Sequence, residues 1–260
     1  METDPDRWIA AVRHSNEALR ALAAPLTADQ LAQRSYDSEW SIAQVLSHLG
    51  SSAEIFGLWL DAGLTGQDPP GQDAFVPIWE TWNARSPQAQ AADSLQANEA
   101  AAERLESLDD GQRERFRLQL FGMDLDIAGL ARMRLSEHAV HSWDVAVALD
   151  PSATVAPEAV GLLIDTLGPI AGWSGKPDGT KRQVHVSVSD PARRFTLATG
   201  EAVTLETAAA GEREEPGPEL RLPAEALIRL VYGRLDPDHT PPVEARGVEL
   251  DELRPIFPGI

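Results

Sequence analysis

The chain has 260 residues, 43% of them apolar, which is enough to build one large domain or two of ordinary size. Its 41 acidic and 22 basic side chains give a formal charge of −19, which repels phosphate backbones and anionic lipid surfaces, so we expect no nucleic-acid and no membrane partner. Because the chain has no cysteine, it has no disulfide, no thiolate metal ligand and no cysteine nucleophile of its own.

Hydropathy along the chain gives no sign of a membrane or secretory segment. No apolar run approaches the roughly 18 residues needed to span a bilayer. The first ten residues, METDPDRWIA, lack the basic and then apolar parts of a signal peptide. We therefore expect a soluble cytoplasmic protein, either a monomer or a homodimer.

The first 150 residues show apolar side chains at three- and four-residue spacing, which is typical of amphipathic helices. The pattern predicts helices near residues 4–24, 41–62, 88–108 and 127–149. The segment TGQDPPGQDA, which contains Pro69, Pro70 and Gly71, separates the second helix from the third. Four long helices with one extended connection predict a four-helix bundle.

After Asp150 and Pro151 the pattern changes. Residues 157–173 predict one helix, with a proline in its first turn. The segments RQVHVSVSD, RFTLATG and AVTLETA alternate apolar and polar residues and predict adjacent antiparallel strands. ELRLPAEALIRLVYGRL predicts a short strand followed by a helix, and another short helix closes the chain. We predict a helical bundle at 1–152 and a small α+β domain with an antiparallel sheet at 153–260.

The predicted helix at 127–149 carries three titratable groups on its apolar face. At 100° per residue, Asp144 lies about 20° and His141 about 40° from Glu137, among apolar neighbours such as Leu130. An unpaired buried carboxylate would cost several kcal/mol, so these groups need partners. A metal ion is one such partner, because the i, i+4 spacing of Glu137 and His141 places two ligands one turn apart.

A third candidate ligand lies on the predicted helix at 41–62. His48 is at the margin of its apolar face, and the small hydroxyl residues Ser51 and Ser52 beside it leave room for a ligand. The alternative is a histidine that forms a hydrogen bond at a helix interface. Metal binding is favoured only when His48 is considered together with Glu137 and His141.

His48, Glu137 and His141 would form a set of two histidines and one carboxylate from two helices. Three protein ligands with an open fourth position are typical of catalytic zinc, although the same set can hold iron or another divalent ion. Asp144 can orient an imidazole from behind, or else belong to the surface or to helix packing. His138, about 100° from Glu137, is expected to face solvent or a domain contact, and a His138/His141 pair is a rival ligand assignment.

Three motifs are similar to those of the mycothiol-dependent maleylpyruvate isomerase family: EWSIAQVLSHL, SEHAVHSWDVAVAL about ninety residues later, and IRLVYGRL followed by LRPIFPG. The resemblance covers nearly the whole chain. It implies a DinB-like metal-binding helical bundle followed by a sterol-carrier-like α+β domain.

The resemblance also implies roles for single residues. It implies that His48, Glu137 and His141 are zinc ligands, and that Asp144 belongs to the family's usual His-x-Trp-Asp ending. It further implies that Arg234, in the turn Tyr232-Gly233-Arg234, can meet a substrate carboxylate at the domain junction. Alternatively, Arg234 caps its own helix through the macrodipole. Asp144 and Arg234 are therefore our candidate catalytic residues, and no residue is assigned to binding the thiol.

The mechanism that the resemblance implies uses mycothiol as a cosubstrate. Zinc would bind the thiol and lower its pKa, and the thiolate would attack a small electrophilic substrate in an isomerisation or a thiol transfer. The missing cysteines fit a nucleophile that arrives with the cosubstrate. The order EHAVH differs from the zinc-protease signature, so a peptidase is disfavoured. The alternatives are a non-catalytic small-molecule binding protein and a metal-dependent hydrolase that activates water with Asp144 as base.

Overall fold

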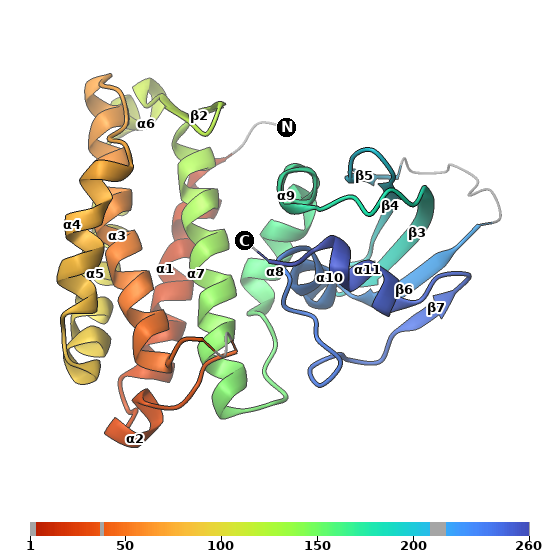
Figure 1. Cartoon of the computed structure of the whole chain (residues 1–260). Coiled ribbons are helices and arrows are strands. Elements are labelled where there is room, and N and C mark those ends of the chain that lie inside the picture. Colours follow the sequence, from red (N-terminus) through yellow and green to blue (C-terminus); the bar gives the residue numbers. More distant parts are fainter. Residues whose placement is uncertain (1–3, 37–38, 209–216, 260) are drawn as a thin grey trace. The chain divides into compact units, whose positions relative to one another are not determined.

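The computed structural model describes residues 4–36, 39–208 and 217–259, and the chain divides into two compact units, Met1–Ala153 and Thr154–Ile260 (Figure 1). This division falls one residue after the boundary expected from the sequence. Within the described ranges, neither unit has a helix whose length and apolarity would let it span a lipid bilayer.

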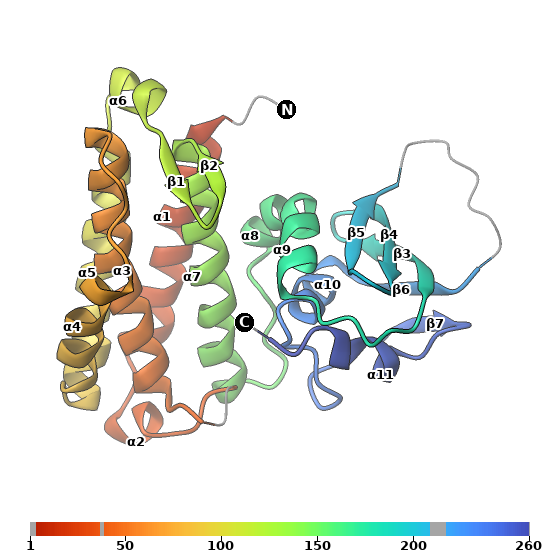
Figure 2. The ribbon, with the colours of Figure 1, turned by 45° about the horizontal axis from the view of Figure 1, so that its top comes forward.

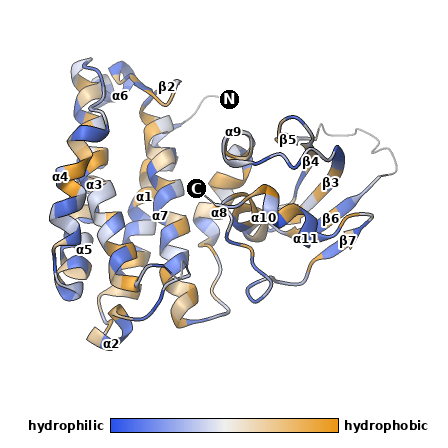
Figure 3. Cartoon of the chain, in the orientation of Figure 1, coloured by the Kyte–Doolittle hydropathy of each residue, from blue (hydrophilic) through white to orange (hydrophobic). Residues whose placement is uncertain are grey.

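Unit 1 is the predicted four-helix bundle. Its long helices are α1 (Pro5–Ala23), α3 (Ile42–Thr65), α5 (Pro87–Glu106) and α7 (Ile127–Leu149). Helices α1 and α3 each pack against both α5 and α7, so the four helices surround one core. All four contribute to the buried cluster that contains Leu19, Leu46, Leu49, Leu95 and Val145. Figure 3 shows hydrophobic and hydrophilic segments interspersed along these helices, as amphipathic helices require.

Local capping contacts fix the ends of the helices that matter for function. Helix α3 begins with a capping box in which Ser41 and Gln44 each accept a hydrogen bond from the other's backbone N–H, and it ends at Gly66 in the left-handed region. Helix α7 is capped by Asp126, whose carboxylate accepts a hydrogen bond from the backbone N–H of Gly129. These caps set where along each helix the functional side chains fall.

Five shorter elements of unit 1 were not expected. They are the helices α2 (Ala28–Leu31), α4 (Gln72–Asn83) and α6 (Asp110–Arg115), and the hairpin strands β1 (Leu118–Leu120) and β2 (Met123–Leu125). Helix α4 was not predicted, because it contains Pro77 and buries only Trp82. Its sequence therefore resembles that of a loop between helices. Strand β1 contacts α3 and β2 contacts α7, and Figure 2 shows the hairpin between these two helices.

Unit 2 contains a five-stranded sheet with the order β5-β4-β3-β6-β7. The strands are β3 (Arg182–Ser189), β4 (Arg193–Thr199), β5 (Thr204–Thr207), β6 (Glu219–Pro223) and β7 (Glu244–Arg246). The predicted antiparallel pairing of β3, β4 and β5 is confirmed, but β6 runs parallel to β3, so the whole sheet is mixed. The helix α10 (Ala224–Val231) follows β6 as predicted, and α11 (Leu250–Leu253) with the 3-10 turn η2 (Arg254–Ile256) closes the chain.

The single helix predicted for 157–173 is wrong in one respect. The segment forms α8 (Pro157–Leu163), a 3-10 turn η1 (Ile164–Thr166) and α9 (Leu167–Ser174). Pro169 explains the interruption, because it has no N–H to continue a helical ladder and is tolerated in the first turn of a new helix.

Gly50 makes room for the attachment of α4 to the bundle. The Trp82 ring is buried against α3, and a Cβ at position 50 would lie 2.2 Å from that ring. Gly57, two turns along α3, has open surroundings, since the nearest atom to its Cβ position is 3.9 Å away.

We predict that Gly50→Ala lowers the free energy of unfolding by about 1–3 kcal/mol, because the buried indole must shift. Gly57→Ala in the same helix should raise it by about 0.5–1 kcal/mol, through the better helix propensity of alanine. Urea unfolding of both variants measures the difference. Equal effects of the two substitutions would contradict this account of α4.

Candidate metal centre

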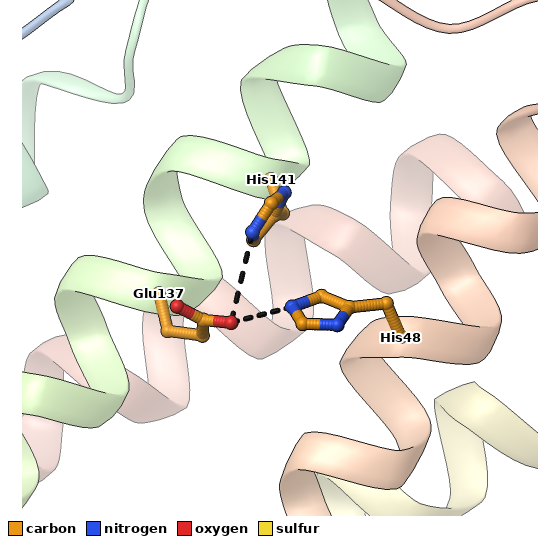
Figure 4. A group of neighbouring side chains, drawn as sticks. All are labelled: His48, Glu137 and His141. Atoms are coloured by element: carbon orange, nitrogen blue, oxygen red, sulfur yellow. Dashed lines mark hydrogen bonds and ion pairs between the residues drawn. The ribbon is translucent and has the colours of Figure 1, made fainter. Parts of the chain in front are cut away.

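Three side chains from two packed helices converge in unit 1 (Figure 4). His48 lies on α3, and Glu137 and His141 lie one turn apart on α7. Glu137 Oε1 is 2.5 Å from His48 Nε2 and 3.6 Å from His141 Nε2. One ligand atom from each residue lies within 4.8 Å of the other two. The structure thus brings together the three residues that the sequence singled out.

The site is open on one side, because its three side chains are partly exposed: 27% for His48, 40% for Glu137 and 16% for His141. The His48 and His141 rings meet edge to face at a centroid distance of 4.6 Å. Trp40 also packs against the His48 ring, in a tilted arrangement with 5.4 Å between the centroids. The imidazoles are therefore held by packing, while the partial exposure of the three side chains leaves the site accessible to a ligand.

Asp144 orients His141 through a hydrogen bond. Its buried carboxylate accepts a hydrogen bond from His141 Nδ1 over 2.8 Å. Because a carboxylate accepts this hydrogen bond, Nδ1 carries a proton, and the contact orients the ring so that Nε2 faces Glu137. An oriented imidazole with a carboxylate behind it is the usual arrangement around a metal-binding histidine.

Electrostatics keep Glu137 charged. Its partial burial works to raise the pKa, but the hydrogen bond with His48 and the nearby positive charges of His141, His48 and Arg134 outweigh burial and hold the pKa well below its ordinary value. Glu137 is consequently a carboxylate at neutral pH and has an oxygen available for a cation.

Arg134 is a buried cation that sequence reasoning missed. Its guanidinium donates to the carbonyl oxygen of Leu49 over 3.2 Å and to the side-chain oxygen of Asn98. Burial lowers its pKa to about 10, and the charge of Glu137 opposes this, so Arg134 stays protonated at neutral pH. Its position one turn before Glu137 on the same predicted helix was the available sequence signal.

His138 does not face solvent as expected. It is buried against α1, and its Nδ1 forms a 2.7 Å hydrogen bond with the Ser15 hydroxyl. Burial and the charges of Arg134 and His141 lower its pKa well below the ordinary value, so the ring is neutral. The prediction from helical angles failed here because it assumed one buried face, whereas α7 is packed against α1 as well as α3. The geometry does not support the rival His138/His141 pair.

The donor set fits a divalent metal ion. Two imidazole nitrogens and one carboxylate oxygen match a tetrahedral zinc site with three protein ligands and one open position. Among the residues that the structure describes, no other group of three histidine, aspartate or glutamate side chains converges in this way. Imidazole and carboxylate ligands suit several divalent ions. The donor set therefore indicates a metal site but does not identify the metal.

Arg234 lies in unit 2, just after α10. Its Nη1 donates to the Tyr232 carbonyl oxygen over 2.8 Å, a contact expected if the side chain caps its own helix. Gly233, between them, has a positive φ of 71° and turns the chain out of the helix. A role of Arg234 toward a substrate stays a prediction.

Comparison with known proteins gives three results. The family model described as "Mycothiol maleylpyruvate isomerase N-terminal domain" matches residues 12–146. The crystal structure of the mycothiol-dependent maleylpyruvate isomerase superposes with a TM-score of 0.66 over 88% of this chain and 89% of that chain, at 12% identity, which shows a common fold. A putative metal-dependent hydrolase from Geobacillus thermodenitrificans (strain NG80-2) is 37% identical over 84 residues, 32% of this chain and 47% of that protein. The chain thus spans about half the length of this curated relative.

We predict that the purified protein binds about one divalent ion per chain, and that His48→Ala and His141→Ala each lose most of it because a ligand is removed. His14→Ala, at an exposed histidine of α1, should keep the full amount, and so should His138→Gln. Elemental analysis after dialysis measures the ion. Full metal content in both His48→Ala and His141→Ala would exclude this site.

Asp144→Asn should raise the dissociation constant of the ion by roughly 10- to 100-fold, because the amide holds His141 less firmly. Asp150→Asn, at the exposed end of the same helix, is the matched control and should leave it unchanged. Competition with a coloured chelator measures both constants. A change below threefold for Asp144→Asn would assign Asp144 to helix packing alone.

Proposed function

The chain belongs to the mycothiol maleylpyruvate isomerase N-terminal domain family, whose model matches just over half of it, and we propose that it is a zinc-dependent thiol transferase or isomerase that uses mycothiol. The observation that carries the proposal is the convergence of His48, Glu137 and His141, whose ligand atoms lie within 4.8 Å of one another. The expected partners are a low-molecular-weight thiol and a small electrophile.

A zinc ion at this site would accept the thiol in its open position and lower the thiol pKa, which makes a nucleophile available at neutral pH. Residues of the protein itself would hold the zinc ion in place. Glu137 remains ionised beside two histidines, and Asp144 holds one of those histidines in a single orientation. Since the chain has no cysteine, the sulfur must come from the cosubstrate.

The same nucleophile supports two outcomes. In a transfer, a carbon–sulfur bond forms while the bond to the leaving group breaks, the leaving group departs with the electron pair, and the thiol proton passes to solvent. In an isomerisation, the sulfur adds to an activated double bond, the former double bond rotates, and the sulfur leaves again. Arg234 is proposed to bind a substrate carboxylate, in addition to its contact at the end of α10.

A hydrolase is the second candidate, because the curated relative carries that description. Hydrolysis at this site would need a general base within reach of a water molecule. Glu137 is a ligand in our assignment, and the Asp144 carboxylate is buried and occupied by His141 Nδ1. This arrangement favours an incoming nucleophile over an activated water.

The non-catalytic binding protein is less well supported. That hypothesis needed the apolar segment at 157–173 to line a cavity. Val160, Leu163 and Leu167 of this segment are buried in the core of unit 2. Side chains that the protein itself already buries give this hypothesis no direct support.

Cobalt substitution tests the proposed function. We predict that mycothiol added to the cobalt-loaded protein produces a sulfur-to-cobalt charge-transfer band in the near ultraviolet, because the sulfur enters the open position. S-methylated mycothiol, which has no thiol to ionise, should give no band, and neither should His48→Ala. A fully cobalt-loaded protein that shows no band with the free thiol would refute the proposal.

A further inference from the structure

A cluster of four aromatic side chains, which we call the aromatic cluster, lies on the surface of unit 1. Its members are Trp59 on α3, Phe75 and Trp79 on α4, and Phe121 at the tip of the β1–β2 hairpin. Their rings meet edge to face, with centroid distances of 5.9 Å for Trp59–Phe75, 6.0 Å for Trp59–Phe121 and 5.9 Å for Phe75–Trp79. Three separate elements thus bring aromatic rings to one place.

Stability does not account for Phe121. Its side chain is 71% exposed, so the ring gains little from burial. Phe121 and Gly122 form the two-residue hairpin turn, with φ values of 52° and 75°. A turn with two positive φ values favours Asn-Gly, and a bulky residue in the left-handed region is strained. A strained and exposed ring points to a functional constraint at this position.

The aromatic cluster lies on the side of α3 that carries His48. Trp59 follows His48 by 11 residues, which is about three helical turns or roughly 16 Å along the axis, so both side chains share one face. Ser52 and Ile55 lie between them on that face. On α7, Met133 precedes Glu137 by one turn and is partly exposed. Small and apolar side chains therefore connect the metal centre with the aromatic cluster.

Trp59 adds an unmatched polar group. Its indole nitrogen is buried, and among the described residues it has no hydrogen-bond partner. An unsatisfied buried donor costs about 1–3 kcal/mol, which an acceptor on a bound molecule would recover. The exposed ring of Phe121, in contact with Trp59, offers such a molecule an aromatic surface beside the indole.

We propose that the aromatic cluster binds the apolar body of the electrophilic substrate, an inference that rests on the proposed function. A reacting carbon must lie within about 3–3.5 Å of the sulfur, which is itself held at the open position of the metal centre. The rest of the electrophile then extends along this face of α3, past the partly exposed Ser52, to the ring of Trp59. The remaining span is roughly 10 Å, which suits two or three fused rings or a short apolar chain. The substrate class is an electrophile with an aromatic or extended apolar group.

Binding of dimethylbimane, a fluorescent two-ring compound that is not an electrophile, tests the aromatic cluster without turnover. We expect Trp59→Ala and Phe121→Asn each to raise its dissociation constant by roughly three- to tenfold, since an aromatic pair contributes about 0.5–1.5 kcal/mol. Trp173→Ala, at a tryptophan of unit 2 that is 68% exposed, is the control and should have no effect. Phe121→Asn should also keep or raise the melting temperature, because asparagine suits the turn. Lost binding in this variant therefore cannot be ascribed to unfolding.

Monobromobimane and iodoacetamide then extend the test to catalysis, because both lose a halide to a thiol and only the first has a two-ring body. Phe121→Asn should raise KM for monobromobimane by roughly three- to tenfold. It should leave kcat/KM for iodoacetamide and KM for mycothiol within twofold of the wild type. No detectable dimethylbimane binding, an unchanged dissociation constant in both variants, or a raised KM for mycothiol would overturn the inference. A missing cobalt–thiol band beside normal bimane binding would refute the proposed function alone.

Discussion

The structure of the candidate site depends on one contact, the approach of Glu137 to His48. These residues are 89 positions apart, and only the packing of α7 against α3 brings their side chains to 2.5 Å. The lowered pKa of Glu137 keeps this carboxylate ionised beside two imidazoles, and such an arrangement can attract a cation from solution. The bundle therefore acts as the rigid support of three candidate ligands, and the capped starts of α3 and α7 set the register in which they meet.

Buried polar groups around this contact would be a liability in an ordinary core. Arg134 is enclosed among helices, with an amide and a carbonyl oxygen as its hydrogen-bond partners, and the negative charge that offsets it is Glu137. Asp144 is buried with His141 as its partner. Each group is tolerated because another member of the site compensates its charge. Such mutual dependence explains why the centre of α7 carries titratable residues where leucine would pack better.

Periodicity and residue spacing in the sequence predicted the long helices and the candidate metal ligands. Long helices with strong apolar spacing were found, and i, i+4 spacing with a histidine on a second helix identified the three candidate ligands. The hairpin and α4 were missed, because a two-residue Phe-Gly turn and a proline inside an exposed helix are local exceptions that only tertiary contacts stabilise. His138 was misplaced for a related reason: a wheel treats a helix as having one buried face, and α7 packs against both α1 and α3.

The metal centre and the aromatic cluster share one physical property: each departs from what stability alone would select. The centre places charges between helices, and the cluster leaves an aromatic ring exposed on a strained turn. Natural sequences break local rules at functional sites, where a bound partner supplies the missing interaction. A cation would satisfy Glu137 and the two histidines, and an apolar body that carries a hydrogen-bond acceptor would cover Phe121 and accept the N–H of Trp59. Because His48 and Trp59 lie on one face of α3, a single molecule reacting at the first site can cover the second.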